Sequence, residues 1–150
     1  MRPATDRRSP RLAAGVGLIE VLIAVAILAF GLLGIAAMQA TTLRASQSAS
    51  ERSEAAIATY AILERMRANY SVAANGGYDL AAMTCNVPTG TNLVTRDQRD
   101  WIAAIHEGMG PTACGQIIGC GGETCRIVVQ WDDTRAGGSA TEQLVTVTRL

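Results

Sequence analysis

The sequence predicts an α+β fold in which one long N-terminal helix packs on a small antiparallel sheet. No proline occurs between Pro10 and Pro88, and the stretch from Leu18 to about Ala68 has no strong turn cluster. We therefore expect one continuous helix of roughly 75 Å there. The last third of the chain instead alternates apolar and polar residues in short runs separated by Gly-Gly turns, which is typical of an antiparallel meander.

The first half of the predicted helix has the length and apolarity of a membrane span. Residues 16–38 carry a single charged side chain, that of Glu20, and at about 1.5 Å per residue they form a helix of about 35 Å. A carboxylate at mid-membrane depth costs about 3 kcal/mol, whereas the Leu, Ile, Val and Phe side chains between Val16 and Ile35 contribute roughly 4 to 8 kcal/mol. We therefore expect this segment to insert despite its acid.

The charges around this segment predict its orientation. Four arginines precede it and only Arg44 and Arg52 follow closely, so the positive-inside bias places the N-terminus in the cytoplasm and the bulk of the chain outside. Two simpler interpretations stay open. Glu20 reaches into the headgroups from a helix end, or the segment is an ordinary secretory signal cleaved near Gly34-Ile35-Ala36.

The second half of the predicted helix leaves the membrane and meets a globular part. Residues 39–53 are mostly Ala, Ser, Thr and Gln, which are too polar for lipid. From Ala55 onward, apolar residues recur at three- and four-residue steps, which predicts one buried face. That face consists of Ala55, Thr59, Ile62, Leu63 and Met66, and the opposite face carries Glu54, Glu64 and Arg65.

Residues 69–150 form the predicted α+β head. The chain from Ser71 to Gly77 ends the long helix, and a loop continues through Thr91. A short amphipathic helix is expected over about 96–107, opened by a capping box of Thr95 and Gln98. Its apolar face is Trp101, Ile102, Ile105 and Met109. The predicted strands are Gln116–Ile118, Cys125–Trp131 and Gln143–Leu150, with turns at Gly121-Gly122 and Gly137-Gly138.

The four cysteines, Cys85, Cys114, Cys120 and Cys125, have spacings that fit no zinc signature. Because the head is predicted to lie outside the inner membrane, where disulfides persist, we expect two disulfides and no metal site. Of the three possible connectivities we favour Cys120 with Cys125, across the Gly121-Gly122 turn, and Cys85 with Cys114. The other two connectivities stay open.

Composition and residue pattern argue against several function classes. The net charge is zero, with thirteen arginines and no lysine against thirteen acids, so the chain lacks the basic face of a nucleic-acid-binding domain. No nucleophile, base and orienting acid form a recognisable set, and we expect neither an enzyme nor a cofactor. His106 is expected to be solvated or capping. Asp132 and Asp133 are expected in a solvated turn, with a calcium-binding turn as the alternative.

The segment Gly15-Val16-Gly17-Leu18-Ile19-Glu20-Val21-Leu22-Ile23-Ala24 resembles the processing site of type IV prepilins. In that family a basic leader ends in Gly, cleavage follows it, and Glu is the fifth mature residue. The resemblance implies that Gly15 is the last leader residue, that Val16 is the N-methylated mature terminus, and that Glu20 acts in assembly. Val16 and Gly17 stand where Phe and Thr are more usual, and Ala13-Ala14 separates Gly15 from the nearest basic residue.

The chemistry of an exposed terminus fits this spacing. Removing residues 1–15 leaves nine arginines and twelve acids, a formal net of −3 in side chains, and frees an amine at Val16. A buried ammonium and the Glu20 carboxylate are both costly in hydrocarbon unless each is paired. If neighbouring helices are staggered along the axis, the amine of one subunit meets the carboxylate of another, which fixes their register.

Further features resemble minor pilins of the PilV family: Phe30-Gly31-Leu32-Leu33-Gly34, Met38-Gln39, residues 50–69, and Trp131-Asp132-Asp133. The resemblance implies four segments: a leader (1–15), a transmembrane and fibre-core half-helix (16–38), an amphipathic half-helix (39–68) and a head (69–150). It also implies an inner-membrane precursor that prepilin peptidase trims and methylates. The mature chain would join other minor pilins, the major pilin and the inner-membrane assembly platform at a pilus tip, supporting adhesion or twitching motility. A type II secretion pseudopilin and a non-polymerising membrane-anchored binding module are the alternatives.

Overall fold

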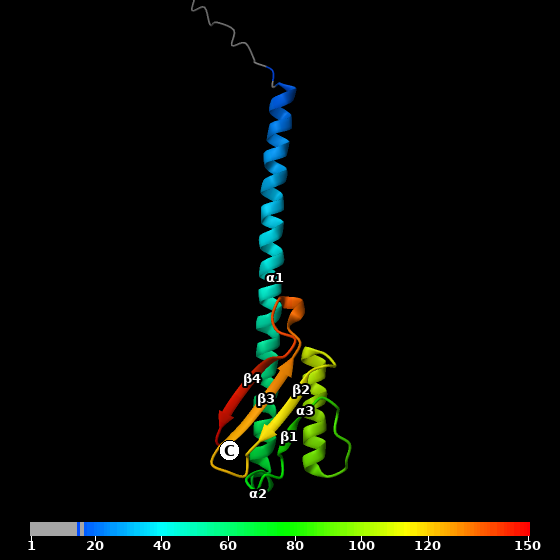
Figure 1. Cartoon of the computed structure of the whole chain (residues 1–150), viewed down its shortest axis with the longest axis vertical. Helices are drawn as coiled ribbons and strands as arrows, with labels where there is room; N and C mark the ends of the chain where they lie inside the picture. Colours follow the sequence, from blue (N-terminus) through cyan, green and yellow to red (C-terminus); the bar gives the residue numbers. More distant parts are fainter. Residues whose placement is uncertain (1–14, 16) are drawn as a thin grey trace, which may run out of the picture. The chain divides into compact units, whose positions relative to one another are not determined.

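The computed structural model describes residue 15 and residues 17–150. Its elements are α1 (Leu18–Ala68), α2 (Tyr70–Ala73), β1 (Leu80–Thr84), α3 (Leu93–Met109), β2 (Cys114–Ile118), β3 (Cys125–Trp131), a 3-10 turn (Thr134–Ala136) and β4 (Glu142–Thr148). The chain divides into two compact units, one that ends at Ala40 and one that comprises Thr41–Leu150. The predicted α+β class is confirmed, and the long helix has the predicted bounds (Figure 1).

The C-terminal part of α1 buries the predicted stripe of side chains. Ala55, Thr59, Ile62, Leu63 and Met66 are all buried, and Ala58 joins them. The hydroxyl of Thr59 is satisfied within the helix, because it donates to the carbonyl of Ala55 at 2.8 Å. The small side chains at positions 55 and 58 leave room for neighbouring elements to approach the helix closely.

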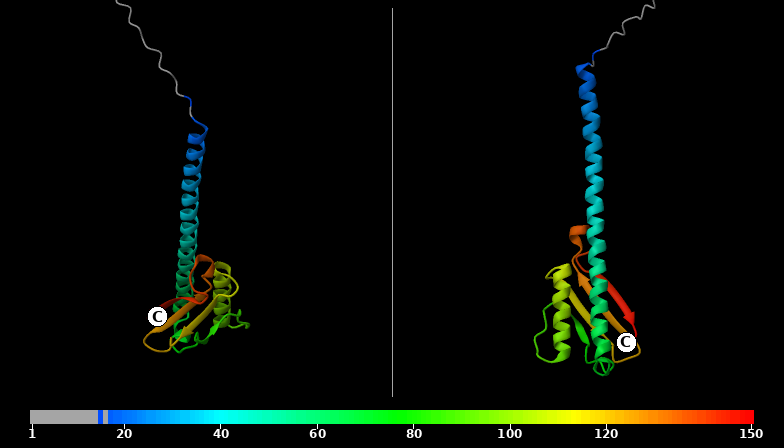
Figure 2. Two further views of the ribbon diagram at one scale, coloured as in Figure 1. Left: turned by 45° about the horizontal axis from the view of Figure 1, so that its top comes forward. Right: turned by 180° about the vertical axis from the view of Figure 1, so that it is seen from behind.

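Helix α3 lies beside this part of α1 on the same face of the sheet (Figure 2). The predicted apolar face is confirmed, since Trp101, Ile102, Ile105 and Met109 are all buried. The indole N–H of Trp101 donates to the carbonyl of Ala58 in α1 at 3.0 Å, which joins the two helices by a buried hydrogen bond.

The start of α3 differs from the prediction. The helix begins at Leu93, and its N-cap is Asn92, whose side-chain oxygen accepts from the Thr95 N–H at 2.8 Å. Gln98 does not complete a capping box with Thr95. It is buried instead, and its amide donates to the carbonyl of Tyr78 at 3.0 Å. Asn92 is the better cap because its side chain reaches a free N–H of the first turn while its own backbone stays extended.

The sheet is an antiparallel meander in the order β1-β2-β3-β4. The β3–β4 ladder is regular over its whole length, from Cys125 opposite Thr148 to Trp131 opposite Glu142. The inner face of β3, which includes Ile127, Val129 and Trp131, packs into the same core as the two helices. The predicted strand bounds of β3 are confirmed, and β2 and β4 are shifted by one or two residues.

Two predictions for residues 69–91 were wrong in part. The segment expected to leave the long helix as a plain loop contains the short helix α2 (Tyr70–Ala73). The loop expected to continue through Thr91 contains β1 (Leu80–Thr84), which pairs with β2 through a register shift between Leu80 and Thr84. Because Leu-Ala-Ala-Met-Thr has few β-branched residues, its pairing with β2 decides its conformation rather than its local propensity.

Gly115 in the middle of β2 allows α3 to pack against the sheet. A Cβ added to Gly115 would lie 2.5 Å from Cη2 of Trp101 and 2.8 Å from Cδ1 of Ile102. These distances are far shorter than carbon atoms tolerate, so only glycine fits between the sheet and α3 at this position. The Trp101 ring therefore rests directly on the backbone of β2.

Candidate functional site

The N-terminal unit begins as a regular helix immediately after two glycines. The carbonyl of Gly17 accepts hydrogen bonds from the N–H groups of Glu20 at 3.0 Å and Val21 at 3.3 Å, and α1 starts at Leu18. Glu20 therefore lies in the first turn, where the helix dipole favours a negative charge. Gly15 is exposed, and Val16 lies outside the described residues.

The surface of this unit is apolar. Every described residue from Gly15 to Ala40 is exposed, including large side chains such as Phe30 at 76%. Among the described residues, α1 is the one helix long and apolar enough to cross a membrane. Gly31 and Gly34 do not interrupt it, and a Cβ added at either glycine would meet nothing within 4 Å. The unit thus presents apolar surface that a lipid or another helix has to cover.

Glu20 is the one charged residue on that surface between Gly17 and Ala40. Its side chain borders a shallow apolar depression on the helix formed with Val21, Ala24, Val25 and Leu28. Within residues 15 and 17–150, no hydrogen bond or ion pair to its carboxylate is found. A cation from outside this helix is required if the carboxylate is to be neutralised in an apolar environment.

A comparison with protein families finds one relevant model in this segment. The model of the prokaryotic N-terminal methylation motif matches residues 10–36, which span the predicted cleavage position, Glu20 and most of the apolar helix. The match supports a type IV pilin-like protein. Comparison with curated proteins and with solved structures gives no significant match.

The motif and the helix together indicate which kind of protein this chain is. The motif is one that prepilin peptidase processes in proteins that assemble with other pilins. It indicates a structural protein rather than an enzyme, and with the apolar helix it is consistent with a membrane-anchored chain that later enters a fibre. The motif's residues 10–14 lie outside the described part of the chain.

In the second unit, polar contacts join α1 to the loop between β3 and β4 and to the first residue of β4. The Ser48 hydroxyl donates to Oδ2 of Asp133 at 2.8 Å, and Arg52 forms an ion pair with Glu142. Asp133 is only 3% exposed, so the prediction of a solvated turn is wrong for this residue. It is buried because the loop folds back over it: its backbone N–H donates to the carbonyl of Ser139 at 2.9 Å.

Asp132, the neighbour of Asp133, is solvated as predicted. Its Oδ1 accepts from the backbone N–H of Thr134 at 2.9 Å, which forms a local turn. Hydrogen bonds from Thr134, first from its hydroxyl and then from its backbone, lower the pKa of Asp132. In the described chain no group of three or more His, Cys, Asp or Glu side chains has the arrangement of a metal site.

Three buried polar atoms close to this region have no hydrogen-bond partner within the described residues. They are Oδ1 of Asp133, Oε2 of Glu51 and Nε1 of Trp131. Ser48, Glu51 and Ala55 follow one another at three- and four-residue spacings, so they lie on one face of α1. This face is polar at Ser48 and Glu51 and becomes apolar from Ala55 onward. The helix therefore contacts the head through two chemically different stretches.

Tyr78 anchors a polar network beneath the end of α1. Its buried hydroxyl donates to Oδ2 of Asp97 at 2.6 Å and accepts from the Asn69 amide at 3.2 Å. Arg65 approaches Asp97 at 3.6 Å and Asp100 at 3.4 Å. Burial, and secondarily the hydrogen bond to Asp97, raises the pKa of the Tyr78 phenol.

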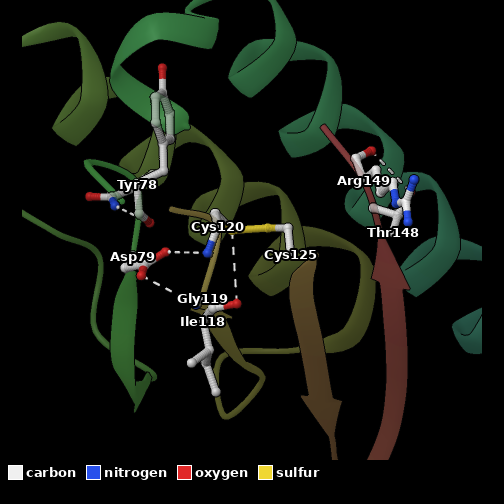
Figure 3. Close-up of a disulfide and its surroundings, with 9 residues drawn as sticks. Tyr78, Asp79, Ile118, Gly119, Cys120, Cys125, Thr148 and Arg149 are labelled. Carbon is white, nitrogen blue, oxygen red and sulfur yellow. Dashed lines mark hydrogen bonds between the residues drawn. A yellow bond between two sulfur atoms is a disulfide. The ribbon is translucent and has the colours of Figure 1, made fainter. Parts of the chain in front are cut away.

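Both disulfides lie at ends of strands. Cys120 is joined to Cys125 across the turn between β2 and β3, and Cys85 to Cys114 between the end of β1 and the start of β2. These are the pairs that the sequence analysis favoured. Asp79 supports the first one, since its carboxylate accepts from the N–H groups of Gly119 at 3.2 Å and Cys120 at 3.1 Å (Figure 3).

His106 lies in the last turn of α3, and its ring binds a carbonyl beyond the end of the helix. Its Nε2 donates to the carbonyl of Ala113 at 3.0 Å, which ties the helix to the segment that leads into β2. Sequence reasoning did not identify the structural roles of Asn92, Asp79 or Ser48. Asn92 precedes the helical pattern and is a local signal, whereas the partners of Asp79 and Ser48 lie 40 and 85 positions away in the sequence.

Proposed function

We propose that this chain is a minor pilin of the PilV type, built at low copy into type IV pili. The observation that carries the proposal is Glu20, which lies within the methylation motif at residues 10–36, is exposed on an apolar helix and has no partner for its carboxylate among the described residues. In a membrane helix that does not associate with other helices, a carboxylate without a counter-charge only costs free energy. A helix that joins a bundle of like helices uses it to bind a cation of its neighbour.

The proposed cation is the mature N-terminus of another subunit. Prepilin peptidase would cleave after Gly15, remove the basic leader 1–15 and methylate the amine of Val16. In the fibre, this amine meets the Glu20 carboxylate of a neighbouring, axially staggered subunit. An ion pair in hydrocarbon forms only where the geometry is good, so the pair selects one register between neighbouring helices.

The remaining segments follow from this assignment. Residues 16–38 form the transmembrane helix of the inner-membrane precursor and then part of the fibre core. Residues 39–68 connect this core to the head, 69–150, which is stabilised by two disulfides in an oxidising compartment. With other minor pilins, the major pilin and the inner-membrane assembly platform, the chain would help to initiate assembly and form the tip, in support of adhesion or twitching motility.

The N-terminus of the purified protein tests the processing step. We expect sequencing and intact mass to show a chain that begins at Val16 with one added methyl group. A chain that begins at Met1 would identify a non-polymerising anchored module, and one that begins at Ala37 would identify an ordinary secretory signal. Recovery with a type II secretion machine instead of pilus proteins would reassign a correctly processed chain to the pseudopilins.

Replacing Glu20 with glutamine tests the pairing, because Glu20→Gln keeps the size and shape of the side chain and one accepting oxygen but removes its charge. We expect the variant to be processed and to accumulate in the membrane while its incorporation into sheared fibres falls at least tenfold, which corresponds to about 1.4 kcal/mol. Glu54→Gln, an exposed acid on the same helix, is the matched control and should leave incorporation unchanged. Undiminished incorporation of Glu20→Gln would contradict the pairing.

A further inference from the structure

Strand β4 ends the sheet with a regular edge whose one charged residue is Glu142, at its first position. It is the outermost strand, and its pairing with β3 is continuous from Glu142 to Thr148. In the described chain, the backbone of β4 makes no hydrogen bond on the side away from β3. The strand contains no proline, lysine or bulge, the devices with which proteins block pairing at an open edge.

The opposite edge of the same sheet, β1, is irregular and is fixed to its inner neighbour β2. The register of β1 shifts between Leu80 and Thr84, and the Gln116 side chain donates to the carbonyl of Ala81 at 2.7 Å. The disulfide of Cys85 with Cys114 follows directly after β1. The two edges therefore differ: β1 is irregular and covalently fixed, whereas β4 is long, regular and open.

The side chains next to the open edge are suited to bind a strand. On the outward face of β4, Val145 is 42% and Val147 is 62% exposed. Val128 of β3, which lies directly opposite Val145, is only 2% exposed, so it adds no exposed apolar surface to that of the two valines of β4. The outward positions of β3 and β4 are Arg126, Val128, Gln130, Gln143, Val145 and Val147, and none of them is acidic.

Two arginines add a positive charge at one end of this surface. Arg126 lies directly opposite Val147 in the ladder, and Arg149 follows the end of β4, two positions after Val147. Within the described part of the chain, neither arginine forms an ion pair. An exposed apolar pair flanked by unpaired cations is complementary to a strand with apolar side chains followed by an acid.

We propose that β4 is a docking edge for an extended strand of a different protein. The strand adds to the sheet through main-chain hydrogen bonds, as in other cases of strand addition. On its outward face it carries apolar side chains opposite Val145 and Val147, and an acidic side chain next to Arg149 and Arg126. The partner is therefore recognised by the free N–H and C=O groups of its backbone, by its alternating side chains and by its negative charge.

A second copy of this chain does not fit the edge. Antiparallel pairing of two β4 strands requires a two-fold axis perpendicular to the sheet, which reverses the direction of α1 at Thr41 in the second copy. The N-terminal segments of the two copies would then have to come from opposite sides. In chains that are anchored in one membrane or fibre, α1 leads into the head from the same side in every copy. This single step rests on the proposed function.

The test uses the full-length protein in detergent and the blocked peptide Thr-Glu-Thr-Val-Thr-Val-Thr. In antiparallel register its Glu lies opposite Arg149 and its two Val lie opposite Val147 and Val145. Hydrogen exchange measured by mass spectrometry should show residues 142–149 exchanging at least fivefold more slowly with saturating peptide, while β1 is unchanged. A version of the peptide with N-methyl groups on the amides that face β4 should not slow exchange.

Charge variants test the recognition of the acid. A peptide with Lys in place of Glu should bind about fivefold more weakly, and Arg149→Glu should reverse this preference. Arg44→Glu, an exposed arginine on α1, is the matched control and should leave both affinities unchanged.

Three outcomes would overturn the proposal. These are no slowing at β4, equal binding of the two peptides, and slowing without peptide that grows with protein concentration, which would identify a second copy. None of these results depends on where the mature chain begins, so failure of this docking edge is distinguishable from failure of the proposed processing.

Discussion

At the scale of single residues, the most informative side chains are buried polar groups whose partners lie far away in the sequence. Asp133 is buried with one oxygen bonded to the Ser48 hydroxyl and the other without a partner among the described residues. Among the described residues Ser48 is the one side-chain donor to this carboxylate, so we expect Ser48→Ala to lower the free energy of unfolding of the head by about 1–3 kcal/mol. Tryptophan fluorescence during denaturation measures this.

The control for Ser48 is its near neighbour Ser50. Ser50 is exposed on the same helix and makes no side-chain hydrogen bond among those found in the described chain. Ser50→Ala should therefore change the free energy of unfolding by less than about 0.5 kcal/mol. If the two variants unfold alike, Asp133 does not depend on Ser48.

Tyr78 makes the stability of the head depend on pH in the alkaline range. Its pKa is raised in the folded protein, so the folded state holds the phenolic proton more tightly than the unfolded chain does. The resulting stabilisation is complete below the unfolded pKa of about 10 and is lost as the pH rises through the folded pKa. Tyr78→Phe should unfold more easily at neutral pH, by about 1 kcal/mol, and lose less stability above pH 10 than the wild type.

Chemical denaturation at several pH values from neutral to alkaline measures this difference. Tyr60→Phe is the control, because the Tyr60 side chain is exposed on α1. Parallel alkaline profiles for the wild type and Tyr78→Phe would show that the Tyr78 proton is not linked to folding.

At the scale of elements, the contact between α3 and β2 depends on one missing side chain. A Cβ at Gly115 would lie 2.5 Å from the Trp101 ring, which is itself fixed by its hydrogen bond to Ala58. Gly115→Ala should destabilise the head by about 1–3 kcal/mol, because the ring has to move. Gly108→Ala in α3 is the contrast: its Cβ would meet only the flexible Glu54 side chain at 3.4 Å, and helix propensity favours alanine.

Thermal unfolding of the two glycine variants decides between these expectations. Gly115→Ala should unfold at a lower temperature than the wild type, and Gly108→Ala at the same or a higher temperature. Equal behaviour of the two would mean that the sheet backbone yields easily at position 115.

Local patterns predicted most elements, and tertiary contacts decided the rest. Periodicity predicted the buried faces of α1 and α3, and alternation predicted β3, because each signal is contained in a few neighbouring residues. β1 was missed because its residues have weak strand propensity and pair only with β2. The burial of Gln98 and Asp133 was missed because their partners, Tyr78 and Ser48, are brought near only by the fold.

The same distinction between local sequence patterns and tertiary contacts applies to the candidate site. The processing motif is a local sequence pattern, and the family comparison matches it at residues 10–36. The open edge of β4 was not predicted, since an edge is a property of the whole sheet: Gln143–Leu150 has the same alternation whether one neighbouring strand is present or two.

At the scale of the whole molecule, the two units differ in the interactions that stabilise them. The unit that ends at Ala40 contains no cysteine and has an apolar surface, whereas both disulfides lie in Thr41–Leu150. In the chain-entropy model, loss of the Cys85–Cys114 bond costs the head about 3–4 kcal/mol and loss of Cys120–Cys125 about 2 kcal/mol, since the longer loop constrains the unfolded chain more.

Paired Cys→Ser variants of each disulfide test this order. Denaturation should show the larger loss for the Cys85/Cys114 pair, and both variants should stay in the membrane fraction after alkaline extraction, because insertion depends on the other unit. A larger loss for the Cys120/Cys125 pair would mean that the turn it closes, with Asp79, matters more than loop length.

The contacts between α1 and the rest of the head change from polar to apolar along the helix, which determines the order in which a pull on the helix would reach them. Ser48 and Arg52 bind the β3–β4 loop and β4, and the apolar stripe begins only at Ala55. Tension that travels along the helix from its N-terminal end reaches the polar contacts before the apolar ones. Hydrogen bonds are lost when their atoms separate by a short distance. We therefore expect a pull along α1 to separate the contacts of Ser48 and Arg52 before it disturbs the apolar stripe that begins at Ala55.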